Sequence, residues 1–208
     1  MSKRLTTEGL REIWDRYAPR YDRDIGFFER RLFGGGRDWV CEQATGNVLE
    51  VAIGTGRNLP HYPAGVTLTG LDLSPAMLAI ARTRAAELQR PIDLREGDAQ
   101  ALPFPDASFD TVVCTLGLCG VPDERKAIAE MHRVLRPGGK LLLLDHIGSH
   151  HRVLHFGQSL LEKLSVRMCG DYQTRRPLPL VEQAGFTVQR KERLKLGTVE
   201  RLAAVKSR

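Results

Sequence analysis

An uninterrupted apolar segment, residues 141–144, does more than any other feature to constrain how this chain folds. It consists of four consecutive leucines, follows the turn Pro137-Gly138-Gly139 and ends at Asp145. A strand without polar alternation is typical of a parallel sheet that is covered on both faces. The chain therefore has to supply helices for two layers, and its 208 residues suffice for one such domain with a full core.

Strand and helix patterns alternate along most of the chain. The predicted strands cover residues 48–51, 66–72, 92–96, 109–114, 140–145, 185–188 and 200–206. Helices are predicted to begin after Ser74, where serine followed by proline is typical of a helix start, and to run from Asp123 to Leu135. This alternation predicts a Rossmann-like, doubly wound α/β fold with a mostly parallel seven-stranded sheet. The last two strands lie close together in sequence, which favours an antiparallel pair.

The first forty residues are predicted to form a helical lid. Apolar side chains recur at helical spacing at Leu10, Ile13, Trp14 and Tyr17. Pro19 is expected to interrupt this helix, and Gly34-Gly35-Gly36 to break the chain. A second helix is expected between the two breaks, from Tyr21 to Phe33, and its apolar side would contain Ile25, Phe28, Leu32 and Phe33. We therefore divide the chain into a lid, residues 1–40, and a sheet domain, residues 41–208.

The positive charge of the chain is concentrated near its end. The net charge is +6, and residues 146–208 contain 12 Lys and Arg against 5 Asp and Glu. This excess indicates either a solvated surface or a positive rim that attracts an anionic substrate or a lipid surface. No nucleic-acid partner is expected, because no regularly spaced aromatic residues or recognised motif accompany the charges.

Cysteine and histidine spacing gives no metal pattern. The four cysteines form no Cys-x-x-Cys pair, and the group His150, His151 and His155 matches no established ligand spacing. We expect no metal site. Because the first residues contain no apolar signal core and no segment is long enough to span a bilayer, a cytoplasmic protein is expected.

Three strand ends carry residues that suit a nucleoside ligand. Gly54-Thr55-Gly56 follows the first strand, where glycine permits positive φ and close approach of a ligand. Asp72 ends the second strand, where a carboxylate can accept hydrogen bonds from ribose hydroxyls. Asp98 follows the third strand and can accept from an adenine amino group. Leu59 stands where a dinucleotide fingerprint has its third glycine, so a nicotinamide oxidoreductase is only a remote alternative.

With these elements in order, residues 46–146 resemble the class I S-adenosylmethionine-dependent methyltransferases. The resemblance is carried by the segments 48–56, 70–78, 97–99, 103–110 and 133–139. It implies that S-adenosylmethionine is the cofactor, with Asp72 at the ribose and Asp98 and Ala99 at the adenine. Ala52 replaces the first glycine of the family's loop. The residues predicted to form the cofactor site are Glu50, Ala52, Gly54, Gly56, Asp72, Leu73, Asp98, Ala99 and Thr115, with Glu50, Gly54 and Gly56 at the methionine end.

Three residues are candidates for the acceptor side. His146 follows the fifth strand and could act as a base because its ordinary pKa lies near neutrality, or it could be a hydrogen-bonded histidine at a strand end. Tyr17 and Tyr21 lie in Tyr-Ala-Pro-Arg-Tyr-Asp, which resembles the N-terminal lid of quinone and phospholipid methyltransferases. That resemblance implies an aromatic ring over the sulfonium, a cation–π contact; the alternative is that both tyrosines are simply packed.

Narrower resemblances point to different acceptors. The segments 113–121, 145–146, 169–170 and 182–186 resemble the methyltransferase-like seven thiol methyltransferases, whereas 17–22 and 58–63 resemble bacterial phosphatidylethanolamine N-methyltransferases. The ubiquinone/menaquinone C-methyltransferases are a third relative. We therefore expect a small or amphiphilic acceptor (a thiol, a lipid amine or a quinone-like molecule), peripheral membrane contact through residues 8–33, and a monomer or homodimer. The alternative function is a catalytically inactive, S-adenosylmethionine-binding regulatory protein.

Overall fold

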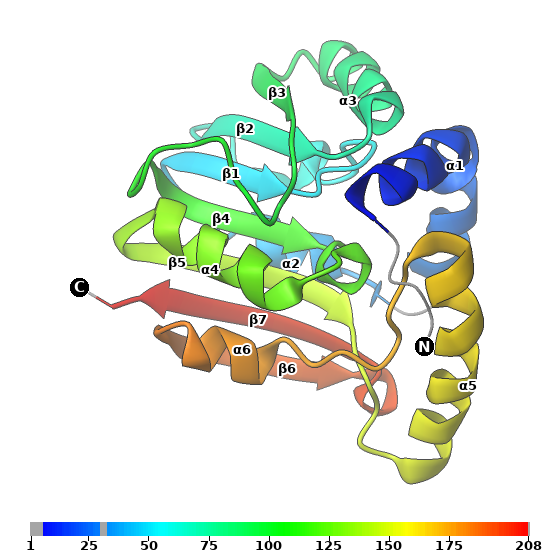
Figure 1. Ribbon diagram of the computed structural model, residues 1–208. Coiled ribbons are helices and arrows are strands. Elements are labelled where there is room, and N and C mark those ends of the chain that lie inside the picture. The colour runs from blue at the N-terminus through cyan, green and yellow to red at the C-terminus, as the bar shows by residue number, and fades with distance from the viewer. Residues whose placement is uncertain (1–5, 30–32, 208) are drawn as a thin grey trace.

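The computed structural model describes residues 6–29 and 33–207. A seven-stranded sheet forms its centre, in the order β3-β2-β1-β4-β5-β7-β6 (Figure 1). The strands are β1 Asn47–Val51, β2 Thr67–Asp72, β3 Ile92–Glu96, β4 Phe109–Thr115, β5 Leu135–His146, β6 Phe186–Leu194 and β7 Val199–Lys206. The first five are parallel, and β7 runs antiparallel to both β5 and β6. The predicted fold class is confirmed.

The strand β5 begins five residues earlier than the predicted strand. Leu135 pairs with Phe109, while Lys140 pairs with Thr111, so the register shifts between these two pairs. The Pro-Gly-Gly turn occupies this irregularity, and Gly138 has a φ of 80° there. The turn is therefore a bulge within the strand, and residues 140–146 form its regular part.

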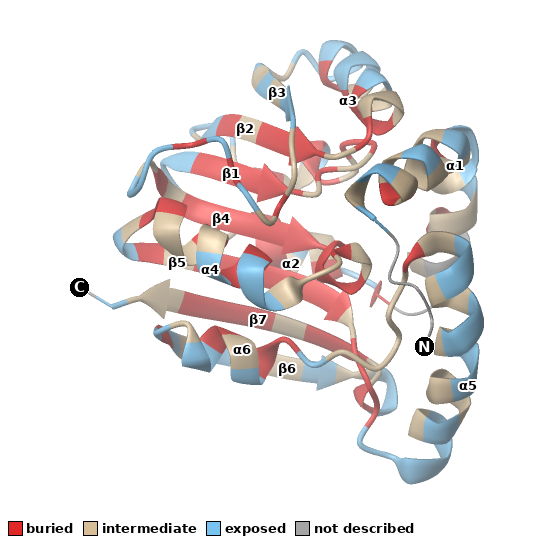
Figure 2. Cartoon of the chain, in the orientation of Figure 1, coloured by how far each residue is buried: buried red, intermediate tan, exposed pale blue. Residues whose placement is uncertain are grey.

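Helices cover both faces of the sheet, as the four consecutive leucines require (Figure 2). On one face, α4 (Glu124–Val134) and α6 (Leu178–Gln183) pack with Leu141 and Leu143. On the other face, α2 (Gly36–Cys41) and α3 (Pro75–Glu87) pack with Leu142 and Leu144. Alternate leucines thus enter opposite cores, which is the period of a strand.

The predicted helix starts are confirmed by capping bonds. Ser74 Oγ accepts a hydrogen bond from Met77 N at 3.1 Å at the start of α3, and Asp123 Oδ1 accepts from Lys126 N at 3.1 Å at the start of α4. Each bond satisfies one of the backbone N–H groups that a helix leaves without an internal partner. Gly36, expected in a chain break, instead begins α2, whose buried Val40 and Cys41 pack on the sheet.

Two helices, α1 (Thr7–Phe28) and α5 (Arg152–Cys169), lie across the carboxyl ends of the parallel strands (Figure 1). Our expectation that Pro19 interrupts the first helix is wrong, because α1 continues through it. A proline inside a helix removes one backbone hydrogen bond and bends the axis, and α1 changes direction along its length in Figure 1. Residues 30–32, including Leu32 of the expected second helix, and the side chain of Phe28 lie outside the description.

Among the described residues, no helix has both the length and the apolar character needed to cross a bilayer.

Candidate functional site

The loop after β1 has an unusual backbone. Ala52, Gly54 and Gly56 all have positive φ, at 56°, 57° and 76°. A Cβ at Gly56 would lie 2.9 Å from Leu59 Cδ1, so close packing explains this glycine, whereas a Cβ at Gly54 would meet nothing within 4 Å. Ala52 adopts the left-handed conformation that favours glycine, at some cost in strain. The loop therefore has three residues with positive φ, and one of them is an alanine.

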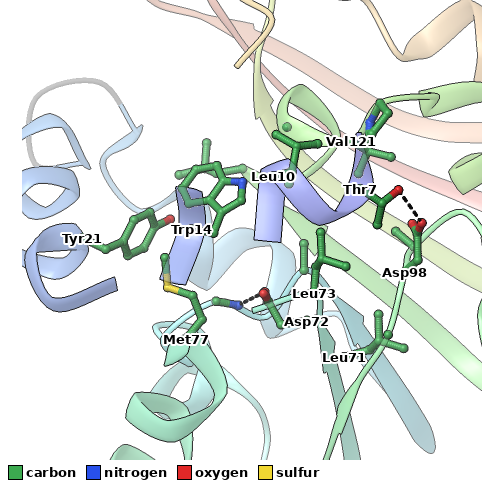
Figure 3. A pocket seen from close by; sticks show the side chains of 18 residues that line it. Thr7, Leu10, Trp14, Tyr21, Leu71, Asp72, Leu73, Met77, Asp98 and Val121 are labelled. Atoms are coloured by element: carbon green, nitrogen blue, oxygen red, sulfur yellow. Dashed lines mark hydrogen bonds between the residues drawn. The ribbon is translucent and has the colours of Figure 1, made fainter. Parts of the chain in front are cut away.

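Asp72, at the end of β2, joins this loop to the start of α3. Its Oδ2 accepts a hydrogen bond from Gly54 N at 2.7 Å (Figure 3). Its Oδ1 accepts from Ser74 N at 2.9 Å. Burial raises the pKa of Asp72 to about 6. Each oxygen can accept a second hydrogen bond, so the carboxylate keeps acceptor capacity for a ligand.

A first pocket of about 90 Å³ lies at these strand ends. The predicted residues that line it are Ala52, Gly54, Asp72, Leu73, Asp98 and Ala99. Thr7, Leu10 and Trp14 of α1 form the opposite wall (Figure 3). Thr7 Oγ1 donates to Asp98 Oδ2 at 3.3 Å, so the start of α1 contacts the acid assigned to the adenine. The donor and acceptor groups fit an adenosyl ligand, with α1 closed against them.

Three predicted cofactor residues, Glu50, Gly56 and Thr115, are not among the residues that line this pocket. Glu50 is buried, and its two oxygens accept from Asn58 Nδ2 and from Tyr62 Oη, both at 2.8 Å. Burial raises the pKa of Glu50 to about 7. Thr115 Oγ1 accepts from Asn58 Nδ2 at 2.9 Å, so Glu50 and Thr115 are held by one amide beneath the loop.

Acidic residues fasten α1 to the rest of the site. Asp15 accepts from Ser74 Oγ at 2.5 Å, and Asp22 accepts from Thr55 Oγ1 at 2.6 Å. Further along, Glu29 pairs with Arg57 at 2.6 Å and also with Arg37. Neither arginine belongs to a motif that can be recognised in the sequence. Charge spacing gives no signal for these pairs, because the partners are far apart in sequence.

A second, larger cavity of about 710 Å³ adjoins the first. Trp14, Tyr21 and Leu116 line both. The ring of Tyr17 also lines the larger cavity, with its centroid 6.0 Å from those of Trp14 and Tyr21. Tyr21 thus lies where the two cavities meet, and Tyr17 lies in the larger one. Burial raises the pKa of Tyr21, so it stays neutral.

His146 lines the larger cavity together with Asp171, a residue that the sequence analysis missed. His146 Nε2 lies 3.1 Å from Asp171 Oδ1 and 3.9 Å from Asp145 Oδ1. Burial alone would lower the pKa of His146, but the contact with Asp171 and the charges of both carboxylates outweigh it and raise the pKa to about 9. His146 Nδ1 is buried and has no hydrogen-bond partner among residues 6–29 and 33–207.

Cys119 completes a cluster with this pair. Ligating atoms of Cys119, His146 and Asp171 all lie within 4.8 Å of one another. Sulfur, nitrogen and oxygen donors at this spacing could hold a metal ion such as Zn²⁺. The sequence contains no motif for such a cluster, because the three residues come from separate segments, and the three histidines considered for a metal are not part of it.

The loop after β4 separates the two cavities. Leu116 has a φ of 53° and its backbone N donates to Leu144 O at 2.7 Å. A Cβ at the following Gly117 would lie 2.8 Å from both Ala52 Cβ and Cys114 Sγ. The β1 and β4 loops are therefore in close contact, and strained backbone of this kind is often found at functional sites.

The chain is similar to several known methyltransferases. A family profile described as a methyltransferase domain matches residues 49–143. A demethylmenaquinone methyltransferase of Thermus thermophilus is 35% identical over 80% of this chain and 81% of its own length. One from Deinococcus radiodurans is 39% identical over 66% of this chain, and a phosphatidylethanolamine N-methyltransferase of Cereibacter sphaeroides is 45% identical over 49%.

Two of these matches span only part of the relative. They cover 60% of the Deinococcus protein and 51% of the Cereibacter protein. Among solved structures, an S-adenosylmethionine-dependent methyltransferase of Thermotoga maritima shares the fold, with a TM-score of 0.73, 23% identity, and coverage of 94% of this chain and 99% of its own. The chain belongs to the class I S-adenosylmethionine-dependent methyltransferases and is related to the ubiquinone/menaquinone methyltransferases.

Proposed function

We propose that this chain transfers the methyl group of S-adenosylmethionine to an amphiphilic acceptor with an ionisable hydroxyl or thiol, and that a reduced quinone is the preferred class. The observation that carries the proposal is the pair of adjoining cavities. The smaller contains Asp72 and Asp98, and the larger contains aromatic rings with His146 and Asp171. The shared wall would bring the two substrates together.

The residues around the first pocket would hold the cofactor. Asp72 would accept the ribose hydroxyls, Asp98 and Ala99 would contact the adenine, and the backbone of Gly54 would lie against the methionine part. When bound, S-adenosylmethionine supplies an electrophilic methyl carbon on a sulfonium. Tyr21 lines both cavities, so its ring would face that positive charge.

The larger cavity would orient the acceptor. Trp14, Tyr17 and Ile13 provide apolar surface on α1, and Met168 does so on α5. An aromatic acceptor can pack against such rings at low cost in conformational entropy. Because α1 is fastened over both cavities, it would also exclude water from the reacting groups.

His146 would hold the acceptor as its anion. With a pKa of about 9 the imidazole is already protonated near neutral pH, so it does not take the acceptor's proton. An acceptor hydroxyl or thiol that loses its proton to water becomes an anion beside the imidazolium, which Asp171 and Asp145 stabilise. The anion is the stronger nucleophile.

The relatives' names support two of the acceptor classes. The proteins named demethylmenaquinone methyltransferases support the quinone class, and the phosphatidylethanolamine N-methyltransferase supports a lipid amine. The carboxylates and aromatic rings would also suit an ammonium group. A protonated His146 would repel that ammonium, so the geometry favours an acceptor that becomes an anion.

The first experiment tests donor binding. S-adenosylhomocysteine at about 100 times its dissociation constant should stabilise the protein by roughly 2.7 kcal/mol, whereas NAD should not. Asp72→Ala should abolish the shift, and Asp93→Ala, an exposed acid on β3, should keep it. A shift with NAD alone would contradict the proposal, and an unchanged shift in Asp72→Ala would contradict the ribose assignment.

The second experiment tests the acceptor. Turnover of labelled S-adenosylmethionine is measured with reduced quinones, alkyl thiols and phosphatidylethanolamine vesicles in parallel. We expect the highest kcat/KM with a reduced quinone. Turnover confined to phosphatidylethanolamine would contradict the acceptor class, and donor binding without turnover of any acceptor would favour the regulatory alternative.

A further inference from the structure

The helix α5 has its apolar side on the outside. None of its residues is buried. Of the nine exposed large apolar side chains in the described part of the chain, seven belong to this helix. They are Val153, Leu154, Phe156, Leu160, Leu161, Leu164 and Met168. At about 100° per residue they form one continuous side, and the outward surface of α5 is exposed in Figure 2.

The inward side of α5 is polar. Gln158 Nε2 donates to Ile147 O at 2.9 Å, and Gln158 Oε1 accepts from Ser149 N at 2.8 Å. Glu162 accepts from both the backbone N and the hydroxyl of Thr174, at 2.7 and 2.6 Å. A helix on the surface of a water-soluble domain normally has the opposite arrangement. The apolar side of α5 is therefore available to an apolar environment outside the domain.

Positive charge borders this apolar side. Arg152, Lys163 and Arg167 are exposed and lie together along one of its edges at helical spacing. The last third of the chain, which contains α5, carries the charge excess of the whole protein. Such a border complements a negatively charged surface.

The apolar side of α5 also reaches the larger cavity. Met168 is 64% exposed and lines that cavity, with Cys169 next to it. From α1, Arg16 and Arg20 line the same cavity. A molecule that moves along the outer side of α5 would therefore arrive at the cavity that contains His146.

We propose that α5 lies in the surface of an anionic lipid bilayer, with its seven apolar side chains inserted and its basic edge at the headgroups. This inference rests on the proposed function, because it gives an amphiphilic acceptor a route from the bilayer into the larger cavity. A helix with an apolar side and a cationic edge is the arrangement that binds in the interface plane.

Charge favours a bilayer over a second copy of the chain. The one acidic residue of α5, Glu162, is bound to Thr174, so a second α5 offers no acidic side chain to the basic edge, whereas anionic headgroups complement it. The helix α1 is less suited to the lipid surface, because Asp15, Asp22 and Glu29 already fasten it to the domain.

Vesicle flotation of the full chain tests the proposal. Vesicles contain either phosphatidylcholine alone or equal amounts of phosphatidylcholine and phosphatidylglycerol. The variant Leu160→Gln/Leu164→Gln removes two inserted side chains and keeps good helix formers. Leu88→Gln, an exposed leucine at the end of α3, is the matched control. Lys163→Gln/Arg167→Gln tests the basic edge.

The wild-type chain and Leu88→Gln should float with the anionic vesicles. The partition coefficient of the double leucine variant should fall about tenfold or more. The double basic variant should lose affinity for anionic vesicles, and its affinity for phosphatidylcholine should not change. All variants should keep the S-adenosylhomocysteine shift, which shows that they are folded.

Three results would overturn the proposal. The wild-type chain could stay in the soluble fraction, the double leucine variant could float like the wild type, or sizing could show a wild-type dimer that the leucine changes dissociate without any vesicle binding. If flotation fails while the S-adenosylhomocysteine shift and turnover of a detergent-dispersed acceptor remain, only the lipid contact is wrong. If the wild type shows no S-adenosylhomocysteine shift, the proposed function itself fails.

Discussion

His146 Nε2 and Asp171 Oδ1 lie 3.1 Å apart in the larger cavity, although His146 ends β5 and Asp171 follows α5. The pair forms only when α5 returns along the edge of the sheet, so the unfolded chain lacks it. The pKa of His146 therefore differs between the two states, at about 9 in the folded protein against an ordinary value near 6.5.

This difference predicts how stability depends on pH. Because the folded pKa is the higher one, the charged histidine contributes its full stabilisation below about pH 6.5, and this is lost as pH rises through about 9. The loss should reach up to about 3 kcal/mol. Asp171→Asn should remove most of it. Denaturant unfolding at several pH values across this window measures the difference between variant and wild type.

The exposed Asp93→Asn is a control for removing a carboxylate, and its pH dependence should match the wild type. If the free energy of unfolding depended on pH in the same way in Asp171→Asn and the wild type, the contact with Asp171 would not raise the pKa of His146.

Donor binding should weaken in acid because of Asp72. Its carboxylate must be ionised to accept the ribose hydroxyls, and burial raises its pKa to about 6. We therefore expect the dissociation constant of S-adenosylhomocysteine to rise up to about tenfold per pH unit below pH 6. Isothermal titration calorimetry between about pH 5 and 8 measures it. A dissociation constant that stays flat down to pH 5 would argue against a role for the ionised carboxylate.

Replacing Ala52, in the loop after β1, by glycine should stabilise the folded protein. Ala52 has a φ of 56°, and glycine removes the steric cost of that conformation. Part of the gain is offset by the greater freedom of glycine in the unfolded chain. Ala52→Gly should therefore raise the free energy of unfolding by about 0.5–1 kcal/mol.

Ala127→Gly is the matched control, since Ala127 lies within α4. It should lower stability by about 1 kcal/mol or more. Thermal or denaturant unfolding measures both. Destabilisation by Ala52→Gly would mean that the methyl group contributes packing that outweighs the strain.

The proline in α1 should matter more for activity than for stability. Pro19→Ala restores a backbone hydrogen bond, so the free energy of unfolding should stay the same or increase, by up to about 3 kcal/mol. A straighter helix would displace Tyr21 from the junction of the cavities. Since small displacements of positioning groups strongly reduce rates, kcat should fall about tenfold or more.

Steady-state kinetics with the best acceptor measures this effect. Glu12→Ala, an exposed change on the same helix, should leave kcat unchanged. If Pro19→Ala kept the kcat of the wild type, the bend in α1 would not be what positions the ring of Tyr21.

The sequence predicts the sheet well because its strands are buried and regular. The four leucines of β5 and the residues at the tips of β1, β2 and β3 identify the architecture and the first pocket. Pro19 leads to a wrong prediction of a helix end. Proline weakens the helix only locally, and the contacts of Asp15 and Asp22 on either side of it hold the helix in place.

The larger cavity is less predictable from the sequence. Asp171 has no motif, and it meets His146 only because of the path that α5 takes. The leucines of α5 recur at helical spacing, but spacing alone does not tell which side of a helix faces the protein. That depends on the partners of Gln158 and Glu162, which the fold brings from distant segments.

The side chains of Trp14, Tyr21 and Leu116 form a wall common to both cavities. Under the proposed function, a substitution at any of them would alter donor affinity and acceptor selectivity together, so neither property can be adjusted there independently. Change of acceptor during evolution is therefore easiest at positions that face only the larger cavity, such as Ile13 and Gln173.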